Sequence, residues 1–218
     1  MRKRKHVRMP LVILIAAALF VFVIAVGTGD IFGLSIGNGA KDLILVNESH
    51  AVPLGYSVKT VELRNGESIG EDAYPQLQKM FDAARADGVY PKVNSGYRTA
   101  SEQRRLFSEN VSELRAKGMS YTEAENETEK SIAKSGHSEH QTGLAADITS
   151  DGTHCSDSIV YSWLENNAYK YGFILRYPAD KIDITHTNYE PWHYRYVGCK
   201  AAYAMRAKGL CLEEYLKL

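Results

Sequence analysis

The sequence predicts an α+β domain, with helices packed on one side of a small antiparallel sheet and an N-terminal transmembrane helix before it. Three observations lead to this prediction. The chain opens with an uncharged apolar segment, segments of helical and of strand-like periodicity alternate after it, and residues 43–218 have the length of a single hydrophobic core. No internal repeat and no low-complexity tract indicates a second globular domain.

Residues 1–8 are expected to be a basic cytoplasmic tail and residues 9–29 a membrane anchor. The anchor has 21 residues without a charge, and at about 1.5 Å per residue it can span ~30 Å of hydrocarbon. Five Lys and Arg in the tail favour the cytoplasm, which places residues 43–218 outside the membrane. A cleaved signal peptide ending near residues 25–27 is the alternative, although the apolar run exceeds the ~7–15 residues usual for one.

After the anchor, residues 30–42 are rich in glycine and are expected to be a linker. Apolar side chains at helical spacing predict helices at residues 73–86, 101–117 and 159–171, and a charged, solvated helix is expected at residues 122–134. Strands are expected at residues 89–94 and 173–176, and in two segments that carry the most distinctive motifs of the chain.

These two motifs contain the residue types of a hydrolytic metal site. His140 and Asp147 lie in the first motif, and Glu190 and His193 lie in the second. Two imidazoles and one carboxylate provide three ligands and leave a fourth position for water, while the other carboxylate can take that water's proton. The combination is the donor set of a hydrolytic zinc centre.

The residues around the candidate ligands predict how they are held. Gly143 and the small apolar residues after it predict a turn that enters a short buried strand at Asp147. A proline disfavours a helix in the second motif, and residues 192–197 alternate as a strand does, which places His193 and Arg195 on one face. Both ligand segments are therefore expected to belong to the sheet.

Two glutamates compete for the role of base. Glu139 is adjacent to His140, whereas Glu190 precedes His193 by three residues. Adjacent residues in a strand point to opposite faces, so proximity in sequence gives Glu139 no advantage. The other histidines have no comparable partner at ligand spacing.

At this point the motifs match a known family. Ser138-x-His140-x-x-Gly143-x-Ala145-x-Asp147 followed by Glu190-Pro191-Trp192-His193 resembles the VanY-type zinc D-alanyl-D-alanine carboxypeptidases, relatives of the VanX dipeptidases and the hedgehog zinc domain. The resemblance runs from about residue 43 to the C-terminus. It includes residues 94–99 with Gln103, and residues 171–178, 195–198 and 212–216.

The resemblance implies a role for each matching residue. One Zn²⁺ per chain would be bound by His140, Asp147 and His193, with Glu190 as the catalytic base. Arg98 would hold the substrate, because a guanidinium meets a carboxylate or a developing oxyanion through two parallel hydrogen bonds. The weaker candidates for lining the same pocket are Tyr97, Gln103 and Ser138.

The implied substrate is a peptidoglycan stem peptide, from which the enzyme would remove the C-terminal D-alanine. The implied location is the bacterial cell membrane, with a single span and an extracytoplasmic catalytic domain. An L,D-carboxypeptidase acting on tetrapeptide stems, an endopeptidase of the same scaffold, and a non-catalytic wall-binding zinc domain are the alternatives. Structural zinc usually has four protein ligands, so a set of three favours an enzyme.

The charge distribution excludes one class of partner. The formal net charge is zero, but the tail holds five of the 26 basic residues and none of the 26 acidic ones, which leaves the remainder acidic. A nucleic-acid-binding domain is expected to carry a basic face, so nucleic acid is excluded as a partner. No protein partner is implied.

The three cysteines are Cys155, Cys199 and Cys211, and an odd number leaves at least one thiol unpaired within the chain. A disulfide between Cys199 and Cys211 is one arrangement that the sequence allows.

Overall fold

The computed structural model describes residues 41–217. The predicted tail (1–8), anchor (9–29) and nearly all of the linker (30–42) lie outside this range. Within residues 41–217, no helix combines the length and the apolar character needed to cross a membrane.

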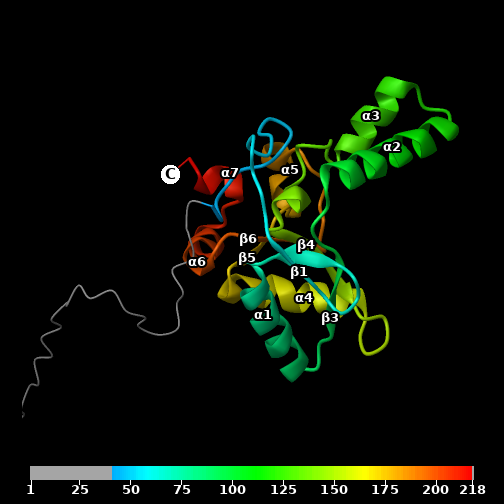
Figure 1. Ribbon diagram of the computed structural model, residues 1–218. Helices are drawn as coiled ribbons and strands as arrows, with labels where there is room; N and C mark the ends of the chain where they lie inside the picture. The colour runs from blue at the N-terminus through cyan, green and yellow to red at the C-terminus, as the bar shows by residue number, and fades with distance from the viewer. Residues whose placement is uncertain (1–40, 218) are drawn as a thin grey trace, which may run out of the picture. The chain divides into compact units, whose positions relative to one another are not determined.

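A four-stranded antiparallel sheet forms the centre of the domain, as predicted (Figure 1). Its strands lie in the order β3 (Pro91–Ser95), β4 (Ala145–Ser150), β6 (His193–Tyr196) and β5 (Phe173–Leu175). Neighbouring strands come from distant parts of the sequence, and both predicted ligand segments occupy the two central positions. The ligands on these two strands therefore have rigid backbones.

A two-stranded sheet that the sequence did not predict lies beside β3. It pairs β1 (Thr60–Glu62) with β2 (Ser68–Gly70). Gly96 fits against β2 only because it lacks a side chain, since a Cβ there would lie 1.9 Å from the carbonyl oxygen of Ser68. This close packing directs the chain from β3 toward Arg98.

The long helices α1 (Tyr74–Ala86) and α4 (Asp157–Asn167) pack on one face of the sheet, as expected from their periodicity (Figure 1). Leu77 and Phe81 from α1 and Leu164 from α4 are buried there. The remaining elements are η1 (Glu139–Thr142), η2 (Ala168–Tyr171), η3 (Ala179–Lys181), α5 (Ile182–Thr185), α6 (Cys199–Lys208) and α7 (Leu212–Tyr215).

The opposite face of the sheet carries charged side chains, and the short helix α7 contacts it. Arg176 and Arg195 are fully buried on this face, and Arg176 pairs with Glu213 of α7. The prediction that helices pack on one side of the sheet therefore holds for α1 and α4. Helix α7 lies on the other side, where its Glu213 pairs with the buried Arg176.

Helices α2 (Ala100–Ala116) and α3 (Tyr121–Glu129) form a hairpin with a small core of its own (Figure 1). Each starts with a capping box, in which a hydroxyl and a glutamate three residues later satisfy free backbone N–H groups. The helix predicted at residues 122–134 ends early, at Glu129, and residues 130–134 are not helical. The three cysteines are free thiols, so the Cys199–Cys211 disulfide is absent.

Candidate functional site

The pairing of β4 with β6 brings two predicted ligands together. Asp147 and His193 are direct partners in this antiparallel pair, so their side chains leave the sheet on the same face. His140 reaches the same point from η1, which Gly143 ends in the left-handed conformation at φ 71°. Candidate ligand atoms of the three residues all lie within 4.8 Å of one another.

The two histidines present different ring nitrogens to this point. The Nδ1–H of His140 donates to the carbonyl oxygen of Gly96 at 2.6 Å, which leaves Nε2 free as a ligand. In His193 it is Nδ1 that lies 3.2 Å from Oδ1 of Asp147. Oδ1 of Asp147 also lies 3.5 Å from Nε2 of His140.

These distances fit a tetrahedral metal ion. Bonds of about 2.0–2.2 Å to nitrogen and oxygen place neighbouring ligand atoms about 3.3–3.5 Å apart. Oδ1 of Asp147 is buried and has no hydrogen-bond partner within residues 41–217, although buried carboxylate oxygens are normally paired. An ion bound by His140, Asp147 and His193 would satisfy it.

The site lies in a cavity of about 590 Å³ whose walls come from several separate parts of the chain. Arg98 and Gln103 line one part of it, Glu129 at the end of α3 and residues 131–134 after it line another, and residues 185–187 and 190–193 contribute a third. Ser138 lines the floor and is buried. The last residues of the segment that was predicted as a solvated helix therefore line the cavity.

Arg98 is held by three partners. Its Nε donates to Oγ of Ser95 at 2.9 Å, its NH1 to Oε1 of Gln103 at 3.2 Å, and its NH2 to Oδ2 of Asp147 at 3.0 Å. Gln103 in turn donates from Nε2 to the carbonyl of Ala133. The predicted pocket residue Gln103 is thus a contact of Arg98, and Ser95 is a further contact that the sequence reasoning missed.

Tyr97 does not line the cavity, in contrast to the prediction. It directly precedes Arg98 in the chain, but adjacency in sequence does not bring its side chain into the same cavity. Its backbone N–H donates to the carbonyl of Ser68 at 2.6 Å, which is a structural contact.

Glu190 lies beside the candidate ligands with only 5% of its surface exposed. Its Oε2 is 3.6 Å from Nδ1 of His193. Burial disfavours the charged carboxylate and raises the pKa of Glu190 to about 7. A carboxylate with such a pKa is well suited to accept and return a proton near neutral pH.

The charges of the ligands depend on one another. Burial disfavours a charge on His193, but the nearby carboxylates of Asp147 and Glu139 outweigh it and raise the pKa of His193 to about 9. Burial lowers the pKa of His140. For Asp147, burial is outweighed by the two histidines, which hold the pKa of this carboxyl well below its usual value.

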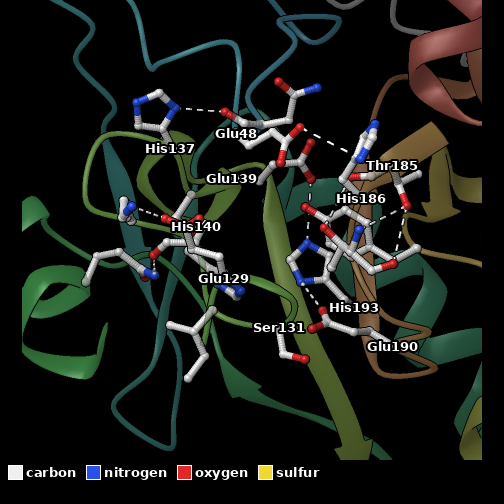
Figure 2. A pocket seen from close by; sticks show the side chains of 18 of the residues that line it. Glu48, Glu129, Ser131, His137, Glu139, His140, Thr185, His186, Glu190 and His193 are labelled. Atoms are coloured by element: carbon white, nitrogen blue, oxygen red, sulfur yellow. Dashed lines mark hydrogen bonds and ion pairs between the residues drawn. The ribbon is translucent and has the colours of Figure 1, made fainter. Parts of the chain in front are cut away.

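The family resemblance favours Glu190 over Glu139 as the base, and the structure gives Glu139 a different position. Figure 2 shows the ring of His193 between the side chains of Glu139 and Glu190. Oε2 of Glu139 lies 3.5 Å from Nε2 of His193, on the side of the ring away from the candidate ligands. One feature of the sequence indicates this position. Arg195 is expected on the same face of the strand as His193, and a buried arginine there requires an acidic partner.

The other cavity histidines are not among the candidate ligands. His137 uses its Nδ1 to contact the carbonyl of Asn47 at 2.8 Å. His186 ends α5 in the left-handed conformation at φ 55°, with its ring mostly exposed. Both line the cavity, but the metal-ligating set within residues 41–217 comprises His140, Asp147 and His193 only.

Comparison with known proteins agrees with this geometry. Residues 66–199 match the family model of VanY, D-alanyl-D-alanine carboxypeptidase. A D-alanyl-D-alanine carboxypeptidase of Enterococcus faecalis is 53% identical over 174 residues, which cover 80% of this chain and 65% of the relative. The aligned part is thus slightly less than two thirds of that relative.

Solved structures resemble the fold as well. A vancomycin resistance D,D-pentapeptidase, a VanY variant in complex with Zn(II), matches at a TM-score of 0.79 with 52% identity, covering 81% of this chain and 99% of that one. The LD-carboxypeptidase LdcB matches at a TM-score of 0.68 with 36% identity, covering 87% and 92%. From the family match and these identities, the chain belongs to the VanY family of D-alanyl-D-alanine carboxypeptidases.

Proposed function

We propose that this chain is a zinc-dependent D,D-carboxypeptidase that removes the C-terminal D-alanine from peptidoglycan stem peptides. The observation that carries the proposal is the convergence of His140, Asp147 and His193 on one point beside Glu190, in a cavity that also holds Arg98. Three protein ligands leave a coordination position open, as catalytic zinc sites require and structural ones do not.

Each side chain then has a task. Bound at these three residues, Zn²⁺ supplies Lewis acidity, which lowers the pKa of water to about 7 and polarises the scissile carbonyl. Oε2 of Glu190 accepts the proton of the attacking water and returns it to the nitrogen of the leaving D-alanine. Burial of Glu190 excludes competing bulk water from this transfer.

Arg98 has unused hydrogen-bond donors that can bind the substrate. A guanidinium has five N–H groups, and Ser95, Gln103 and Asp147 occupy three of them. Two N–H groups remain, and because Arg98 lines the cavity, they can bind a terminal carboxylate or a developing oxyanion there. Held on three sides, Arg98 loses little further side-chain entropy when the substrate arrives.

Product analysis tests the proposal. The full chain is incubated with a synthetic pentapeptide stem and with the matching tetrapeptide, and the products are identified by mass spectrometry with and without chelator. Loss of one D-alanine from the pentapeptide, abolished by chelator, is expected. Cleavage of the tetrapeptide alone would replace the proposal by the L,D-carboxypeptidase alternative, which the likeness to LdcB favours.

Zinc binding at pH 7 is expected to release about one proton or more. With a pKa of about 9, His193 is protonated in the metal-free protein below that pH, and zinc must displace this proton to bind Nδ1. A histidine at its usual pKa of about 6.5 would release only about a quarter of a proton. Apparent zinc affinity should therefore rise with pH up to about 9 and flatten above it.

Calorimetric titration in two buffers with different ionisation enthalpies measures the number of protons released. The same titration repeated at pH 9.5 is the control, because His193 is then mostly neutral before zinc binds. Because zinc-bound water with a pKa of about 7 adds about half a proton, a total release below about one proton at pH 7 would contradict the charge state derived for His193.

The membrane location is part of the proposal and is supported by the sequence alone. Residues 1–8 are the cytoplasmic tail, residues 9–29 the single membrane span, residues 30–42 the linker and residues 43–218 the catalytic domain outside the bacterial membrane. Alkaline extraction of membranes should leave the protein in the pellet. Release into the medium with a new N-terminus near residue 27 would favour the cleaved signal instead.

A further inference from the structure

Three buried polar side-chain atoms have no hydrogen-bond partner within residues 41–217: Oδ1 of Asp147, Oε2 of Glu139 and Nε2 of His193. The first points at the metal position already described. The other two face each other at 3.5 Å, on the far side of the His193 ring (Figure 2). A ring movement of a few tenths of an ångström would make them a hydrogen bond, which satisfies both.

Oε2 of Glu139 is available to accept a hydrogen bond from His193, because the two arginines that contact Glu139 bind its other oxygen, Oε1. Its Oε1 accepts from Nε of Arg176 and from NH1 of Arg195, both at 2.8 Å. All three side chains are completely buried. Arg176 also pairs with Glu213 through two hydrogen bonds of 3.0 and 2.6 Å, so the four buried charges balance.

We propose that Glu139 is the positioning residue of His193, an inference that rests on the proposed zinc site. A neutral imidazole has one N–H and one lone pair, and an ionised carboxylate can only accept. With Glu139 opposite Nε2, the N–H must be on Nε2, and the lone pair of Nδ1 is left for the metal. Glu139 thereby selects both the tautomer and the orientation of the ring.

Segments near both ends of the domain support this carboxylate. NH2 of Arg195 donates to the carbonyl oxygens of Asp42 and Ile44 at 3.1 and 2.9 Å, and Arg176 is held by Glu213 of α7. Residues 42–44 and α7 therefore contact the metal site only indirectly, by holding the two arginines that bind Glu139. This explains why a four-residue helix far along the sequence contacts the face that carries the ligands.

Glu139→Gln tests the inference, because the amide is nearly isosteric but has only one acceptor oxygen. If that oxygen stays with the two arginines, the amide N–H faces His193, which must then place its N–H on Nδ1 and lose the metal lone pair. Zinc affinity should fall about 10- to 100-fold, as other losses of a partner to a ligating histidine do. Competition with a zinc-binding indicator measures it, and circular dichroism verifies the fold.

Glu129→Gln is the matched control, because it removes the same charge from the same cavity without contacting the ligands. Its zinc affinity should stay within about twofold of the parent chain, whereas equal losses in both variants would reduce the role of Glu139 to a general charge effect. Unchanged affinity in Glu139→Gln would overturn the inference.

A measurement on the unaltered chain decides the matter even if the variant fails to fold. In zinc-loaded protein with ¹⁵N-labelled histidine, the Nε2 proton of His193 should appear as a slowly exchanging, downfield resonance, as expected for a buried donor to a carboxylate. A His193 ring without that proton would overturn the inference while zinc binding and hydrolysis, and with them the proposed function, still stand.

Discussion

Glu190→Gln is expected to abolish hydrolysis while zinc remains bound. The amide cannot accept the proton of the attacking water, and general base catalysis of this kind contributes about 10²–10⁴-fold to the rate. The three candidate ligands are unchanged, and the substitution removes a buried carboxylate whose pKa of about 7 shows how poorly its charge is solvated. Turnover of the pentapeptide and zinc content by elemental analysis measure the two effects separately.

Glu190→Asp is the informative comparison. It keeps a carboxylate but shortens its reach, so it should retain more activity than the glutamine variant at the same zinc content. If Glu190→Gln turns over substrate as the parent chain does, Glu190 is not the base. If it loses zinc instead, Glu190 contributes to metal binding rather than to proton transfer.

Arg98→Lys is expected to lower kcat/KM by about 10²–10³-fold, the range found when one donor of an oxyanion site is lost. Lysine keeps the charge but lacks the planar fork, so it cannot contact Asp147, Gln103 and the substrate together. Arg105→Lys is the control, since Arg105 lies on the exposed surface of α2 and pairs only with Glu109 within residues 41–217.

The separate kinetic constants identify the atom that Arg98 meets. A higher KM at unchanged kcat indicates the terminal carboxylate, because that contact exists equally before and during the reaction. A lower kcat indicates the oxyanion, which exists only in the transition state. Full activity of Arg98→Lys on the pentapeptide would exclude both roles.

The donor set of the site was predictable because its chemistry is local. The spacing of His140 and Asp147 around Gly143, and the alternation that puts His193 and Arg195 on one face, follow from turn and strand geometry. The helices at α1 and α4 were predicted for the same reason, since their apolar spacing is regular. The pair β1–β2 was missed because each strand has only three residues.

Apart from the contact of Ser95 with Arg98, the site contacts that sequence reasoning missed join distant segments. Tyr97 was expected to line the pocket, but it is not among the residues that line the cavity. For Glu139, the sequence suggested only the role of a base, in competition with Glu190. Nothing near Glu139 in the sequence indicates that two arginines surround it. A buried charge reveals its function through its partners, and those partners are chosen by tertiary packing.

From residue types and spacing alone, the candidate metal ligands and a small antiparallel sheet that carries them could be predicted, and the resemblance to a known family indicated Glu190 as the base. Folding places Asp147 opposite His193, Arg98 against Asp147, and Glu139 behind the ring of His193, and none of these contacts could be predicted beforehand. Residue type and periodicity act over only a few positions. Strand register and the neutralisation of buried charge are instead settled between segments that meet only when the chain folds.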